Sequence, residues 1–287
     1  MKLAPDLHHA LRMKIAGPWP FITFRSYSLA GRHFTWLSRQ HRKGLAREAR
    51  GLEHAAVPFW QTEAYNWYTG AFFAVGSFLF MLGSFLSILP AEIASASTRT
   101  INIVFFLGSV PFTIAGYLQH FQTANAAPFS VDPTAATPPA RVSLIGWRPG
   151  SVDWLSSFSQ FVGTVAFNFN TFDALVASPD WVRQDFEIWV PGMIGSILFL
   201  VSGYLAFIET SSGYWSWKPR ELAWQIVFVN LLGCVAFMIA STLAFVPAGG
   251  EAWWIPDLAN IGLLLGGLGF LIGALLMTRE SASAAPG

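Results

Sequence analysis

Three ionisable residues, Asp173, Glu209 and His120, stand toward the ends of long apolar stretches and are the first candidates for chemistry. An ionisable side chain inside a membrane often belongs to a proton or ion path. At roughly 1.5 Å per helical residue, Asp173 lies about 28 Å past Trp154, and Glu209 about 21 Å past Gly195. We therefore expect Asp173 at the outer interface, with a proton or cation role as the alternative. We expect the Glu209 side chain to be solvated at the end of a helix, and His120 to lie near the cytoplasmic face.

The other reactive side chains exclude most catalytic chemistry. The remaining five histidines precede the first long apolar stretch, and Cys234 is the single cysteine. This inventory provides no disulfide within the chain, no metal-ligand cluster and no pair of axial haem ligands at depth. An intramembrane hydrolase would also lack a base beside its nucleophile. We predict no catalytic residue, no metal site, no intrinsic cofactor and no enzymatic activity.

Neutral polar residues are the remaining candidates. Gln160, Asn168 and Asn170 belong to the third apolar stretch, and Asn230 to the fifth. Amide side chains in membrane helices usually form hydrogen bonds between helices, and this is the favoured interpretation. The alternative is a polar pocket, because Gln160 and Asn230 each stand three residues before a repeated glycine and a threefold arrangement would bring them together.

The composition identifies the elements that must carry these residues. Hydrophobic side chains make up 53% of the 287 residues and charged side chains 11%, against about 25% charged in soluble chains. A net charge of +1 offers no general attraction for nucleic acid. The chain is therefore predicted to be an all-α polytopic membrane protein, because a helix satisfies its own backbone hydrogen bonds in lipid. The six predicted spans are 68–90, 101–121, 155–177, 190–209, 225–246 and 259–277.

The distribution of positive charge gives the orientation. Fifteen of the 17 lysines and arginines fall on the side that holds both termini, while Arg99 and Arg183 fall on the other side. The positive-inside rule then places both termini in the cytoplasm. We expect the protein in the bacterial inner membrane.

A threefold internal repeat is the strongest pattern in the chain. Tryptophans seven residues apart precede the first, third and fifth spans, and in each case a glycine follows nine residues later and a phenylalanine four after that. The second helix of each pair repeats the Gly-x-x-x-Phe spacing. This pattern predicts three tandem helical hairpins with parallel orientation. Glycine near the bilayer midplane lets two helix backbones approach. The predicted packing glycines are Gly76, Gly108, Gly163, Gly195, Gly233 and Gly266.

The cytoplasmic flank suggests one further helix. Residues 33–56 project onto a helix with apolar residues on one side and basic residues opposite, which predicts an amphipathic helix on the anionic inner leaflet or, alternatively, a soluble helix docked under the bundle. The predicted organisation is an N-terminal segment with this helix, hairpin 1, a Pro-rich cytoplasmic loop, hairpin 2, hairpin 3 and a short tail. The N-terminal segment covers 1–66, hairpin 1 covers 67–121 and the loop covers 122–146. Hairpin 2 covers 147–210, hairpin 3 covers 211–280 and the tail covers 281–287.

Several stretches resemble those of bacterial YrhK-like membrane proteins. They include VGSFLFMLGSFL, FFLGSVPFTIAGYLQHFQTANA, QFVGTVAFNFNTF, IGSILFLVSGYLAFIE and VNLLGCVAFMIAS, within roughly residues 33–280. Each hairpin helix is similar to the short helices of that family. The resemblance implies paired membrane helices and brings no catalytic or binding residue with it. Asp173 departs from the apolar or hydroxyl residue that the resemblance leads us to expect.

Two functions are compatible with this pattern. The favoured expectation is a non-catalytic accessory or scaffolding subunit that contacts membrane lipids or other integral membrane subunits, with lipid, pigment or quinone at its surface. The alternative is a transporter or channel for a small neutral solute that uses the amide residues. Nucleic acid is not an expected partner.

Overall fold

The computed structural model describes residues 13–284 except 30, 49–51, 53–55, 132–140, 177–179 and 251. Most of the described chain is helical, and its long helices each have at least 22 residues. These are α3 (Glu63–Ile88), α5 (Thr98–Ala124), α6 (Val152–Asp173), α8 (Val190–Ser211), α9 (Leu222–Leu243) and α10 (Ile255–Ser281). Shorter helical segments flank them: η2 (Phe59–Gln61) precedes α3, α4 (Ala91–Ala94) follows α3, η4 (Ala174–Val176) follows α6, and α7 (Trp181–Gln184) and η5 (Asp185–Trp189) run directly into α8.

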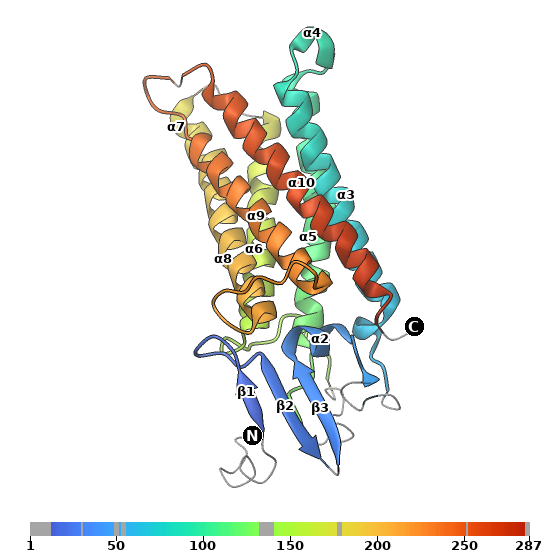
Figure 1. Ribbon diagram of the computed structural model, residues 1–287. Helices are drawn as coiled ribbons and strands as arrows, with labels where there is room; N and C mark the ends of the chain where they lie inside the picture. Colours follow the sequence, from blue (N-terminus) through green and yellow to red (C-terminus); the bar gives the residue numbers. More distant parts are fainter. Residues whose placement is uncertain are drawn as a thin grey trace.

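The long helices form a closed ring. Each packs against the next in chain order, and α10 returns to pack against α3. Figure 1 shows them running side by side, with a small sheet and the short helix α2 (Ser38–Lys43) below one end. We call this end the α2 end and the other the opposite end. The chain therefore encloses a single central axis between its helices.

Five helical segments are long and apolar enough to cross a membrane. They are α3, α5, the continuous segment Trp181–Ser211, α9 and α10, which cover five of the predicted spans and extend beyond most of their predicted bounds. The third predicted span corresponds to α6, which has 22 residues but falls outside this group. The reason is its polar content, which includes Gln160, Asn168 and Asn170.

The repeated glycines allow close approach within each pair of consecutive long helices. A Cβ on Gly76 would lie 2.8 Å from the carbonyl oxygen of Gly108, and similar approaches of 3.1–3.2 Å occur in the other two pairs. A side chain at these positions would therefore push two backbones apart. The three pairs are Gly76 with Gly108, Gly163 with Gly195, and Gly233 with Gly266.

The predicted amphipathic helix over 33–56 is wrong for most of its described part. Residues Arg32–Leu37 form strand β3, which pairs antiparallel with β2 (Phe24–Leu29), and β2 pairs with β1 (Lys14–Ala16). Aromatic and β-branched residues favour a strand here, and Gly31, with φ +81°, supplies the turn of the hairpin. Within the predicted range, an α-helix covers only Ser38–Lys43, while 49–51 and 53–55 lie outside the described residues.

Gly44 ends α2 and fixes its position against the bundle. Its φ is +72°, the left-handed conformation that glycine adopts without strain. A Cβ there would also collide with the carbonyl oxygen of Gln61, just before α3. Glycine therefore lets the chain turn sharply after Lys43, while α2 stays packed against α5, α8 and η2 at the end of the ring.

Candidate functional site

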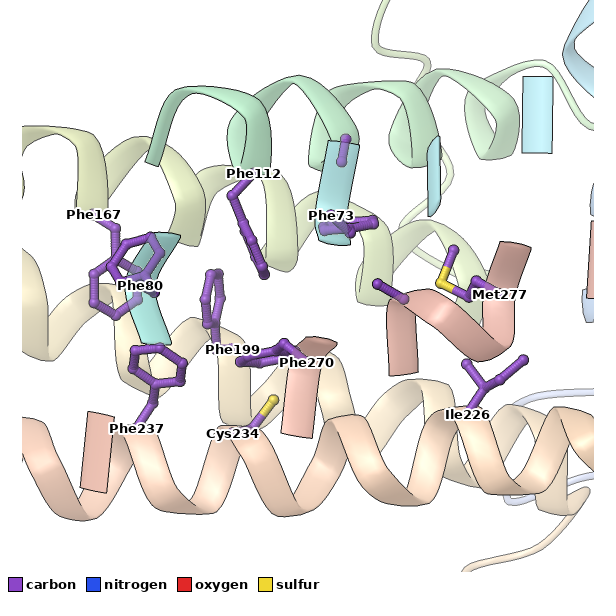
Figure 2. Close-up of a cluster of buried hydrophobic side chains, with 12 residues drawn as sticks. Phe73, Phe80, Phe112, Phe167, Phe199, Ile226, Cys234, Phe237, Phe270 and Met277 are labelled. Atoms are coloured by element: carbon purple, nitrogen blue, oxygen red, sulfur yellow. The ribbon is translucent and has the colours of Figure 1, made fainter. Parts of the chain in front are cut away.

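Six buried phenylalanines fill the middle of the ring (Figure 2). Each stands four residues after a repeated glycine, and each comes from a different long helix. The rings from α3, α6 and α9 form one triangle, with centroids 5.7–6.5 Å apart, and those from α5, α8 and α10 form a second, at 5.4–5.8 Å. We call this set the phenylalanine plug: Phe80, Phe112, Phe167, Phe199, Phe237 and Phe270.

The plug leaves little free volume on the axis. The space between its rings is about 10 Å³, and Ser77, Ser109 and Thr164 line it together with the aromatic rings. A water molecule needs roughly 10–15 Å³ of such space. The plug therefore holds one water at most and separates the two halves of the ring interior.

A cavity of about 70 Å³, with both charged and apolar side chains in its wall, lies between the plug and α2. Phe199 and Phe270 of the plug form part of its wall, and Arg39, Arg42 and Lys43 of α2 form another part. We call it the α2-side cavity. Its volume exceeds the roughly 10–15 Å³ that a single water molecule needs, so it holds more than one. Five carboxamide side chains also line it: Asn66, Gln119, Gln122, Gln160 and Asn230.

Glu280, at the end of α10, holds two cations of α2. The Arg39 guanidinium donates to both Glu280 carboxylate oxygens, and its Nη2 lies 2.8 Å from Oε2. Lys43 Nζ donates to the same Oε2 at 2.7 Å. All three side chains are buried. These cations therefore neutralise a carboxylate inside the protein, whereas the sequence placed them on an anionic lipid surface.

Glu209, near the end of α8, makes the equivalent contacts with the other side of α2. Its Oε1 accepts from Ser38 Oγ at 2.6 Å and from Arg42 Nη1 at 3.0 Å. Asp153 of α6 lies 3.6 Å from the same Arg42 nitrogen. The expectation of a solvated Glu209 is wrong, because its side chain is 1% exposed and α2 covers it.

Burial and the two neighbouring arginines act on Lys43. Loss of water lowers the pKa of Lys43 to about 8, against the opposing attraction of Glu280 and with a further lowering by Arg39 and Arg42. Keeping the Lys43 ammonium charged near neutral pH therefore costs free energy. A buried cation under this constraint requires the carboxylate beside it.

The four predicted amide residues divide between different places. Gln160 and Asn230 line the α2-side cavity, and Gln160 Oε1 accepts from Gln119 Nε2 at 3.0 Å. Asn168 Nδ2 donates to Thr113 Oγ1 at 2.9 Å, and this bond joins α6 to α5 away from the walls of the α2-side cavity. Asn170 Nδ2 donates to the carbonyl oxygen of Ile188 at 2.7 Å, toward the opposite end.

Asp173 and His120 lie apart from the cavity walls. Asp173 is the half-buried last residue of α6. His120 is fully buried, with Nδ1 3.1 Å from Ser157 Oγ and its ring packed against Trp154 and Phe158. Among the described residues, no group of three or more His, Cys, Asp or Glu side chains is placed to hold a metal ion.

A second cavity, of about 300 Å³, lies on the other side of the plug. Phe167 lines both this cavity and the plug, and Asn170, Asp185 and Asn260 add polar groups to its wall. Asp185 Oδ1 accepts from the backbone N–H of Val246 at 3.2 Å. We call it the opposite cavity. The opposite cavity is bounded by residues of α6, η5, α8, α9 and α10 and meets the plug at Phe167.

The sequence contained a signal for the ion pairs that its interpretation did not use. Gln122, Glu209 and Glu280 follow the repeated glycines of α5, α8 and α10 at the same spacing, and all three are buried at the α2 end. A recurring polar residue in three apolar helices requires a partner. The basic residues spaced along 38–43 supply it for both glutamates, while Gln122 Nε2 donates to Asn66 Oδ1 at 3.1 Å and to the Trp60 carbonyl oxygen.

Comparison of the chain with models of known protein families, with curated proteins and with solved structures gives no match. The resemblance to YrhK-like proteins therefore stays a prediction. The apolar helices indicate a membrane protein.

Proposed function

We propose that this chain is a non-catalytic polytopic protein of the bacterial inner membrane that passes a small neutral solute along the axis of its ring. The observation that carries the proposal is the order of the cavities. Phe199 and Phe270 line both the α2-side cavity and the plug, and Phe167 lines both the plug and the opposite cavity. Rotation of a few rings would join the two cavities.

The proposal includes α6 as a sixth span and a threefold repeat of hairpins. The second tryptophan makes a corresponding contact in two of the three pairs that are spaced seven residues apart. Trp154 Nε1 donates to the Ile145 carbonyl oxygen and Trp224 Nε1 donates to the Ser216 carbonyl oxygen, both at 3.1 Å. The two triangles of the plug give further support. With six spans, both termini lie on the side of α2, and the charge distribution favours the cytoplasm for that side.

Solute flux into liposomes tests the proposal. Vesicles containing the protein are expected to swell faster than empty vesicles in a gradient of acetamide or urea. Asn230→Leu should remove most of this difference, because the amide lines the α2-side cavity. Asn168→Leu is the matched control on α6, since Asn168 bonds to Thr113 between helices. Equal swelling with and without the wild-type protein would exclude passage.

A scaffold or accessory role is the second candidate. Three indoles at the α2 end, Trp147, Trp215 and Trp217, are 65–75% exposed. Such side chains prefer the membrane interface or a partner protein. Mild-detergent purification followed by mass spectrometry of co-purifying subunits, lipids, pigments and quinones tests this role. A stoichiometric partner without solute flux would favour the scaffold.

A further inference from the structure

We propose that the α2-side cavity binds a small uncharged molecule that carries a carboxamide or urea group. The inference uses the cavity of the proposed function but requires only binding, so it would hold for a scaffold as well as for a transporter. The volume of the cavity limits the size of the ligand. About 70 Å³ is room for more than one water molecule, which suits acetamide or urea and excludes sugars and nucleotides.

The charges around the cavity favour an uncharged ligand. The three cations of α2 face three carboxylates: Arg39 and Lys43 bind Glu280, while Arg42 binds Glu209 and lies near Asp153. Positive and negative groups are therefore equal in number and already paired. An entering ion would lose its hydration without meeting an unpaired counter-charge. A dipolar neutral molecule avoids that cost.

The unpaired hydrogen-bonding groups identify the ligand chemistry. Arg42 is 6% exposed and lines the cavity, but its Nη1 is already held by Glu209. Asn230 lines the same cavity and makes no hydrogen bond with another described side chain or backbone group, and Gln160 uses only its oxygen. The site thus offers the NH₂ donors of Asn230 and Gln160 and the Asn230 carbonyl acceptor. A carboxamide complements this set, because its oxygen accepts and its NH₂ donates.

Cys234 provides a built-in reporter of occupancy. It is the single cysteine of the chain, it is 3% exposed, and its side chain faces the same region in Figure 2 as Phe199 and Phe270. It also lines the α2-side cavity. A ligand in the cavity will therefore slow the reaction of this thiol with a small neutral reagent such as methyl methanethiosulfonate.

The experiment measures this reaction rate on the full chain in mild detergent, with added acetamide or urea and with the charged analogues of similar shape, acetate and guanidinium. We expect acetamide and urea to slow modification several-fold and the charged analogues to leave the rate unchanged. Asn230→Leu should abolish the protection. Asn170→Leu should keep it, since Asn170 lines the opposite cavity.

Equal protection by acetamide and acetate, or full protection in Asn230→Leu, would overturn the inference. A ligand-detected NMR titration of acetamide provides the second measurement, and Gln160→Leu replaces Asn230→Leu if that variant does not fold. Absence of saturable acetamide binding by NMR also overturns it. The two proposals can fail separately. Protection of Cys234 without solute flux would support the binding site and contradict passage, whereas flux without protection would support passage and contradict the binding site.

Discussion

At the scale of single residues, the cations of α2 differ in what they contribute. Arg39 forms two parallel hydrogen bonds with Glu280, whereas Lys43 forms one with the same carboxylate. A planar guanidinium matches a carboxylate in this way and an ammonium does not. Burial also lowers the pKa of Lys43 to about 8. Arg39 is therefore expected to be the principal partner of Glu280.

Exchange of each cation for methionine tests this difference. Arg39→Met should destabilise the protein by about 3–5 kcal/mol, because it breaks a buried pair and leaves Glu280 with Lys43 alone. Lys43→Met should cost much less, since Arg39 keeps Glu280 paired. The measurement is thermal unfolding in detergent, followed by a thiol-reactive dye that labels Cys234 when the core opens. Equal losses in the two variants would contradict the assignment.

The pH dependence of stability follows from Lys43. Its pKa falls from 10.5 when unfolded to about 8 in the folded protein. Between these values the unfolded chain binds more protons, so the contribution of Lys43 to the free energy of unfolding rises with pH. Wild type should therefore gain stability relative to Lys43→Met as pH rises from about 8 toward 10. A stability difference independent of pH over this window would show that Lys43 titrates normally.

At the scale of elements, the repeated glycines set how closely the helices pack. Gly76→Val would place side-chain atoms against the backbone of Gly108 and should destabilise by about 1–3 kcal/mol or more. Gly150→Val is the control, because a Cβ there meets nothing within 4 Å. Both variants are compared by the same Cys234 labelling during thermal unfolding. Loss of stability in Gly150→Val of the same size would remove the packing explanation.

Helix positions were predictable from the sequence to a larger extent than the site. Apolar length alone located α3 and α10 to within a few residues, because lipid requires such helices. Strand β3 was missed because its residues also fit one face of a helix, and pairing with β2 depends on the turn at Gly31. Burial of Glu209 was missed because its partner, Arg42, is 167 residues away in the chain. The recurring polar position in α5, α8 and α10 indicates that Glu209 needs a partner, but it does not identify Arg42.

At the scale of the whole molecule, the number of spans decides the topology. If α6 crosses the membrane, the loop after α3 and the segment after α6 lie on one side and the C-terminus on the other. Alkaline phosphatase, active only in the periplasm, should be active when fused after Leu89 or after Val176 and inactive at the C-terminus. High activity of the C-terminal fusion would indicate five spans and contradict the proposal of three hairpins with the same orientation.

Passage of solute along the axis of the ring, across the phenylalanine plug, is the central proposal. Flux of acetamide into liposomes, compared between wild type and Phe199→Ala, tests this directly, with the folding of the variant checked by Cys234 labelling. Phe199 lines both the α2-side cavity and the plug, so its truncation should open the plug toward the α2-side cavity and raise the flux several-fold. Unchanged flux in a folded Phe199→Ala protein would contradict the account.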